Sequence, residues 1–97
     1  MNANSPSESA FDFLDFLDFP EAYPLKVIGK PTAQFETEIV ELVRARCPQA
    51  EHIEVASKQS RGGKYISLTV TFTAYSRQQL EDIYRDLYES GLVVMTL

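Results

Sequence analysis

Residues 64–74, KYISLTVTFTA, form the clearest strand pattern in the chain, because residues 65–73 divide into two sets of side chains that alternate without a break. Side chains that alternate in this way point to opposite faces of a β-strand. The stretch therefore predicts a strand with one buried face and one face rich in threonine. The buried face carries Ile66, Leu68, Val70 and Phe72, and the threonine-rich face carries Tyr65, Ser67, Thr69, Thr71 and Thr73.

The sequence on both sides of this strand has recognisable turn and helix signals. Before it, residues 58–63 (KQSRGG) predict a turn in which the glycines supply positive φ, and residues 52–57 predict a second strand. After it, Ser76 and Gln79 match the capping box that opens a helix. A glycine then ends the helix, and residues 92–97 predict the last strand. The apolar stripe of this helix is Leu80, Ile83, Tyr84 and Leu87.

Upstream, residues 23–28 predict a first strand, and Thr32 caps a first full helix that runs to Cys47. The order is βαββαβ, and right-handed crossovers place both helices on one face of the sheet. We therefore predict an α+β, ferredoxin-like plait with a four-stranded antiparallel sheet. Its open face carries Lys26, Ile28, His52, Glu54, Tyr65, Ser67, Thr69, Thr71, Thr73, Val94 and Thr96.

The N-terminal part of the chain differs in composition from the domain proper, residues 23–97. Residues 1–9 are small and polar and predict a disordered leader, whereas residues 10–22 predict a short, acidic and very apolar helix or turn. Its apolar side chains are expected to pack on the open sheet face, on the helices or on another molecule. We favour an N-terminal helix that closes its own domain over a docking motif for a partner's groove.

Charge and composition limit the classes of function. The net charge is −5, but residues 1–21 hold five acids and no base, so the rest of the chain is neutral. Neither part has the basic surplus that binding to phosphate backbones requires. The single cysteine, Cys47, forms no intramolecular disulfide, and residues 1–10 lack the pattern of a secretion signal. We expect a cytoplasmic protein.

The residues that could carry chemistry are few. One histidine, His52, and one cysteine, Cys47, do not make a catalytic set, and two such residues are too few for a structural zinc site. No phosphate-binding or dinucleotide-binding glycine motif is present. We therefore predict no catalytic residues, no metal and no cofactor, and we predict that the chain is not an enzyme.

Two groups of residues are candidates for binding. Lys58, Arg61 and Lys64 cluster at the predicted turn and form either an anion-binding patch or a solvated turn. Tyr65 lies where a base-stacking aromatic residue would lie in an RNA-binding sheet. Such sheets use more than one stacking residue, and Tyr23 is the one other candidate on the first strand. The candidate interaction surface comprises Phe11, Phe13, Phe16, Tyr65, Ser67, Thr69, Thr71 and Thr73.

Three stretches carry a family resemblance: residues 17–29 (LDFPEAYPLKVIG), residues 60–70 (SRGGKYISLTV), and residues 83–88 (IYRDLY) together with residues 94–97 (VMTL). They are similar to the conserved opening, hairpin and closing segments of the YbeD-like family of small, uncharacterised bacterial proteins. The hairpin here is one glycine longer than the family pattern. The resemblance implies a βαββαβ fold related to ACT-type regulatory domains, and it brings no established catalytic residues.

These observations lead to three functional hypotheses. The first is a non-enzymatic regulatory or protein-interaction domain with a protein partner, or with itself in a homodimer. The second, which the ACT resemblance implies, is a sensor of an amino acid or metabolite that binds near residues 29–32 or at a dimer seam. The third is weak RNA binding, which the neutral charge of the domain disfavours.

Overall fold

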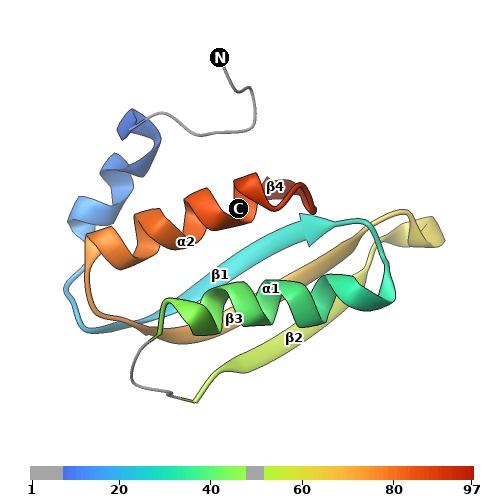
Figure 1. Ribbon diagram of the computed structural model, residues 1–97, viewed down its shortest axis with the longest axis horizontal. Coiled ribbons are helices and arrows are strands. Elements are labelled where there is room, and N and C mark those ends of the chain that lie inside the picture. The colour runs from blue at the N-terminus through green and yellow to red at the C-terminus, as the bar shows by residue number, and fades with distance from the viewer. Residues whose placement is uncertain (1–7, 48–51) are drawn as a thin grey trace.

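The computed structural model describes residues 8–47 and 52–97 and has the predicted order of strands and helices (Figure 1). The strands form one antiparallel sheet in the order β2-β3-β1-β4, and both α-helices lie on the same side of it. This confirms the ferredoxin-like plait. The elements are η1 (Glu8–Phe16), β1 (Glu21–Gly29), α1 (Ala33–Ala45), β2 (Glu54–Gln59), η2 (Arg61–Gly63), β3 (Ile66–Ala74), α2 (Arg77–Glu89) and β4 (Val93–Thr96).

Strand β3 lies in the interior of the sheet, and its alternating pattern sets the two faces. Leu68 pairs with Val27 and Val70 with Leu25 on β1, and all four side chains are fully buried beneath the helices. The threonines of β3 lie on the opposite face and are half-buried. Strand β1 begins at Glu21, two residues before the predicted domain boundary, because Glu21 and Ala22 continue the ladder with β3.

The two helices cover the apolar face, and α2 does so with the stripe that its sequence predicts. Phe35, Ile39 and Val43 of α1 are buried. At the start of α2, the Ser76 Oγ accepts a hydrogen bond from the Gln79 backbone N–H at 3.1 Å, as the capping box predicts. Thr32 occupies the N-cap position of α1, but its side chain makes no capping hydrogen bond. The buried residues of α2 are Leu80, Ile83, Tyr84 and Leu87.

Element η1 is a 3₁₀-helix, and its three-residue period explains how its side chains divide. Phe11 and Leu14 form a buried ridge on the domain, whereas Phe13 and Phe16 form an exposed ridge. The aspartates form the third ridge. The segment packs against α2 and not against the open sheet face. The prediction of a disordered leader falls largely on residues 1–7, which lie outside the described part of the chain.

An irregularity in β4 corrects one prediction about the open face. Ile28 pairs with Met95, but Gly29 pairs with Val93, so Val94 is an extra residue in this edge strand. Val94 and Met95 are both about half exposed. Thr96, which alternation placed on the open face, is on the helix side instead, where its Oγ1 lies 2.8 Å from the hydroxyl of Tyr88 on α2.

Candidate interaction surface on the open sheet face

The threonine-rich part of the open face is a flat, polar stripe. Thr69, Thr71 and Thr73 on β3 pair with Lys26, Pro24 and Ala22 on β1, so these side chains share one face. The threonines and Ser67 are half-buried, because neighbouring side chains on the sheet cover their lower parts. Such a stripe can meet water without cost, and it supplies hydroxyl groups rather than an anchoring pocket.

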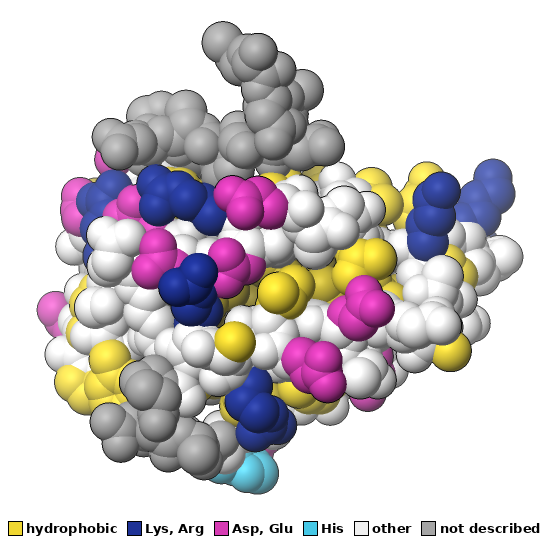
Figure 2. Space-filling model, viewed as in Figure 1, with side chains coloured by type: hydrophobic (Ala, Val, Ile, Leu, Met, Phe, Trp, Pro, Cys, Tyr) yellow, Lys and Arg dark blue, Asp and Glu magenta, His cyan; other side chains and the backbone are white. Residues whose placement is uncertain are grey.

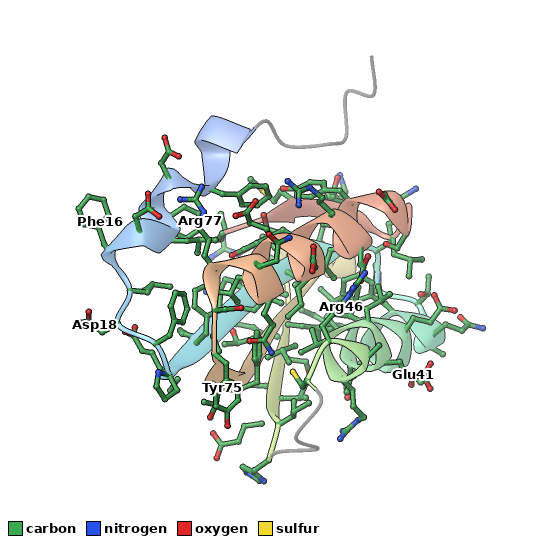
Figure 3. The ribbon with its side chains drawn as sticks, turned by 60° about the vertical axis from the view of Figure 1, so that its left-hand side comes forward. Phe16, Asp18, Glu41, Arg46, Tyr75 and Arg77 are labelled. Carbon is green, nitrogen blue, oxygen red and sulfur yellow. The ribbon has the colours of Figure 1, made fainter. Side chains whose placement is uncertain are left out.

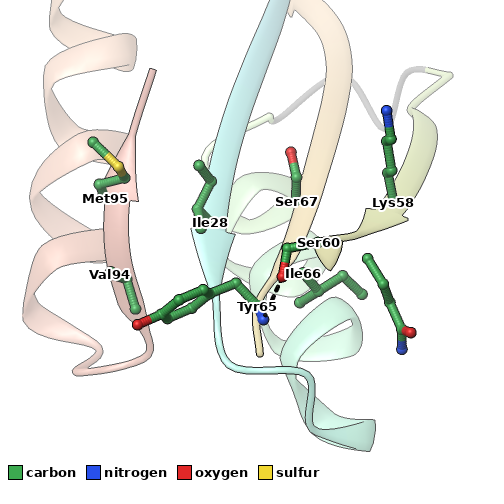
Figure 4. Close-up of a pocket in the computed structure, with 9 residues that line it drawn as sticks. Ile28, Lys58, Ser60, Tyr65, Ile66, Ser67, Val94 and Met95 are labelled. Carbon is green, nitrogen blue, oxygen red and sulfur yellow. Dashed lines mark hydrogen bonds between the residues drawn. The ribbon is translucent and has the colours of Figure 1, made fainter. Parts of the chain in front are cut away.

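The end of the open face near the β2–β3 hairpin is apolar and hollowed. A depression of about 440 Å³ lies there, above the Ile28 side chain (Figure 4). The Tyr65 ring extends across β1 toward Val94 and closes one side of it, and Met95 borders it from β4. We call this depression the sheet-face hollow. Its lining residues are Ile28, Lys58, Gln59, Ser60, Tyr65, Ile66, Ser67, Val94 and Met95.

The hairpin beside the hollow holds Tyr65 in place through its turn. The Ser60 Oγ accepts a hydrogen bond from the Tyr65 N–H at 3.0 Å, and the Ser60 N–H donates to the Tyr65 carbonyl at 2.9 Å. Gly62 and Gly63 have φ values of 84° and 71°, a backbone conformation that other residues rarely adopt. The two glycines therefore supply the positive-φ positions of the turn η2, which borders the rim of the hollow.

The three basic residues of the predicted anion patch divide between rim and tip. Lys58 lines the hollow, and Arg61 and Lys64 lie at the hairpin tip next to it. Among the described residues, none of these three side chains forms an ion pair. In Figure 2, Lys and Arg side chains stand apart from acidic ones at the hairpin end, whereas over the helices the two kinds are interspersed.

The phenylalanines of the predicted interaction surface lie elsewhere. Phe11 is only 2% exposed, with its ring centroid 5.7 Å from that of Tyr84, so it belongs to the core and not to a binding surface. Phe16 is 88% exposed and points away from the domain (Figure 3). The structure therefore separates the predicted surface into the sheet face and an exposed ridge, Phe13 and Phe16, on the helix side. We call the described segment 8–18 the leader and this ridge the leader ridge.

Arg77 fixes the leader on the domain, a role that sequence reasoning missed. Its guanidinium contacts Asp15 and lies 3.5 Å from Asp12 on η1, while its Nε donates to Glu81 at 2.8 Å. The hydrogen bond that Arg77 donates to Asp15, followed by the one that it donates to Glu81, raises the pKa of Arg77. The sequence signal was the three-residue spacing of the aspartates, which places them in one line on a 3₁₀-helix.

The remaining polar groups with unusual surroundings are structural. The hydroxyls of Tyr23 and Tyr84 lie 2.5 Å apart in the core, and burial raises the pKa of both phenols. Tyr23 therefore faces the helices, and the candidate RNA face retains Tyr65 without the second stacking residue. His52 is exposed and 3.3 Å from Glu54, whereas Cys47 is buried and its Sγ lies 3.8 Å from the Gln79 amide.

The other loop suggested by the sequence, residues 29–32, is closely packed at its first residue. A Cβ on Gly29 would lie 2.2 Å from the Phe35 ring and 2.7 Å from the Leu92 carbonyl oxygen. The glycine is therefore required for the approach of β1 to α1. Within the described residues no group of three or more His, Cys, Asp or Glu side chains could hold a metal ion. No helix of this part is long and apolar enough to cross a membrane.

Comparisons with known proteins give a family but no activity. Residues 15–97 match the family described as protein of unknown function (DUF493). A UPF0250 protein of Chromobacterium violaceum is 42% identical over 83 residues, which cover 86% of this chain and 93% of that protein. One from Paraburkholderia phytofirmans is 38% identical over 94 residues, covering 97% and 99%.

A solved structure supports the fold. The solution structure of protein HP0495 from H. pylori superposes with a TM-score of 0.64 at 20% identity, covering 84% of this chain and 85% of that one. At this identity the likeness concerns the fold alone. The family match confirms the likeness to YbeD-like proteins that three stretches of the sequence indicated. The chain therefore belongs to the DUF493 (UPF0250) family of small bacterial proteins of unknown function.

Proposed function

We propose that this chain is a non-enzymatic protein-interaction domain of the bacterial cytoplasm that docks a protein segment in the sheet-face hollow. One observation carries the proposal: exposed apolar side chains of β4 and of the β2–β3 hairpin meet around a depression whose basic neighbours have no acidic partners in the described residues. Tyr65, Val94 and Met95 are between 42% and 51% exposed. Clustered apolar exposure of this kind is typical of binding surfaces, and scattered single residues are not.

The chemistry of the hollow defines the partner. An aromatic or long aliphatic side chain would bury the apolar wall formed by Tyr65 and Met95. A carboxylate next to that side chain would meet Lys58 at the rim. The expected partner segment is therefore apolar and acidic, and its association is weakened by salt. A single cysteine and no intramolecular disulfide are compatible with a reducing compartment.

Site-specific photo-crosslinking in living bacteria tests the proposal. A photoreactive phenylalanine analogue replaces Tyr65 in one strain and Thr37, an exposed position on α1, in a control strain. We expect discrete protein adducts from position 65, fewer from position 37, and loss of the former when Val94→Asp is added. Equal labelling from both positions, or adducts that persist with Val94→Asp, would count against docking in the hollow.

A second candidate function is the sensing of a small molecule. The volume of the hollow lies within the roughly 300–1,000 Å³ that is typical of small-molecule sites. The ligand would be an apolar molecule with a carboxylate, and it would bind in the hollow and not at residues 29–32. A thermal-shift screen of amino acids and carboxylic acids checks this candidate. A shift that Val94→Asp abolishes would support it, and no shift with any compound would eliminate it.

A further inference from the structure

The described surface of the chain itself contains a segment with the chemistry that the hollow fits. The large exposed apolar residues outside the hollow are Phe13, Phe16, Val55, Tyr75 and Leu97. Phe16 has the highest exposure of the set, 88%, and is a rigid aromatic side chain between two aspartates in sequence, Asp15 and Asp18. The Phe13 ring instead makes an edge contact with Tyr84, with centroids 6.4 Å apart.

The leader ridge is presented outward in a fixed conformation. Phe11 and Leu14 anchor η1 on the domain, and the Arg77 ion pairs hold its acidic ridge. The Asp18 backbone N–H donates to the Glu21 Oε1 at 3.1 Å, which orders the turn after Phe16. Within the described residues the Asp18 carboxylate has no cationic partner. Figure 3 shows Phe16 and Asp18 at the outer edge of the molecule.

The leader of a chain cannot fill the hollow of the same chain in this fold. Element η1 packs on α2, on the helix side, whereas the hollow is on the open side of the sheet. Figure 1 shows η1 and the β2–β3 hairpin at opposite ends of the molecule. An intact leader can therefore reach a hollow only in a second copy.

We propose that the sheet-face hollow binds the leader of a second copy of this chain, with Phe16 as the apolar anchor and Asp18 facing Lys58. This inference rests on the proposed function, because it names the partner of the same hollow. Two different surfaces meet, so the contact is heterologous, and copies join head to tail into open chains or closed rings. One anchor and one charged contact make a weak association that salt reduces.

Sedimentation velocity of the purified full chain over a range of concentrations tests the inference. Wild type forms larger species as the concentration rises to about 1 mM, where weak contacts are populated. About 0.3 M salt, which shortens the screening length below about 8 Å, weakens this association. The variants Phe16→Ser and Val94→Asp each stay monomeric. Both positions are exposed, so both variants unfold at the temperature of wild type.

Mixing the two variants is the decisive step. Phe16→Ser keeps an intact hollow and Val94→Asp keeps an intact leader, so an equimolar mixture forms a pair of chains that cannot extend further. Val55→Asp is the matched control, because Val55 is another exposed valine on an edge strand, β2, and this variant associates like wild type. Met95→Asp is a second variant of the hollow and behaves like Val94→Asp.

Three results would overturn the inference: a monomeric wild type at every concentration, a mixture that stays monomeric, or association that Val55→Asp abolishes. The last result would place the contact at the β2 edge. None of them decides the proposed function. Adducts from position 65 to other proteins, lost with Val94→Asp, would leave the hollow as a docking surface whose partner is another chain.

Discussion

The helix-covered face of the sheet and the open face differ in whether their charged side chains form ion pairs and whether their apolar side chains are buried. On the helix side, Arg46 binds Asp86 through two hydrogen bonds of 2.7 and 3.1 Å, and Arg77 and Arg85 both contact Glu81. On the open side, apolar side chains are half exposed and the neighbouring cations lack acidic partners among the described residues. The first face stabilises the fold, and the second is the surface to which we assign the proposed binding.

Leu25 and Ile28 give the largest expected difference between the two faces. Both are apolar residues of β1, but Leu25 is fully buried beneath the helices and Ile28 is half-buried under the hollow. Leu25→Ala should lower the free energy of unfolding by about 2–5 kcal/mol, whereas Ile28→Ala should lower it by about 1 kcal/mol. Urea denaturation measures both values. Equal losses would remove the distinction between the faces.

Gly29→Ala is the next test of the helix side. The added Cβ would overlap the Phe35 ring and the Leu92 carbonyl oxygen, so β1 or α1 must shift. We expect a loss of about 1–3 kcal/mol in the free energy of unfolding, the usual result of overpacking. Ala22→Ser on the exposed side of β1 serves as the control and should change stability by less than about 0.5 kcal/mol. An unchanged Gly29→Ala variant would contradict the packing at this position.

The fold was predictable from the sequence because its signals are local. Strand alternation at residues 64–74 and the Ser76–Gln79 capping box each specify an element without tertiary information. The site was predictable only in part. Tyr65 and Lys58 were identified, but Val94 and Met95 share the open face only because of a bulge, and alternation alone assigned them to opposite faces. A hollow built from all four strands is a tertiary feature that no local pattern contains.

The leader carries a sequence signal whose meaning depends on the type of helix, which the prediction of a helix or turn left open. Aspartates at every third position spread around an α-helix, but they align on a 3₁₀-helix, whose period is three residues. Alignment brings Asp12 and Asp15 to the same arginine, Arg77. Arg77 lies more than 60 residues from these aspartates in the sequence. Their arginine partner therefore could not be identified from the sequence.

The buried tyrosine pair on the helix side predicts a pH dependence of stability. Burial raises the pKa of Tyr84 above its ordinary value of 10.0, so above about pH 10 the unfolded chain loses a proton that the folded chain retains. The free energy of unfolding should therefore fall as the pH rises from about 10 to 11. Denaturation curves should show a shallower fall for the double variant Tyr23→Phe/Tyr84→Phe. An equal fall in both proteins would contradict this account.

Arg77→Gln should loosen the leader while leaving the rest of the helix side in place. Its contacts to Asp12 and Asp15 are lost, and hydrogen exchange of the η1 amides should become several-fold faster. Arg44→Gln is the control, because among the described residues Arg44 forms no ion pair, and it should leave this exchange unchanged. If η1 exchanges at the same rate in Arg77→Gln and wild type, apolar packing alone holds the leader.

Methyl and aromatic NMR spectra of the full chain, recorded at about 50 μM and about 1 mM, report on both faces at once, over concentrations that populate weak association. The account predicts that the Val94 and Met95 methyl signals, together with the Phe16 ring signals, shift and broaden at the higher concentration. Ile39 and Leu80, buried on the helix side, should stay unchanged. Concentration-independent signals from Val94 and Met95, or changes centred on residues 54–59 of the β2 edge, would contradict it.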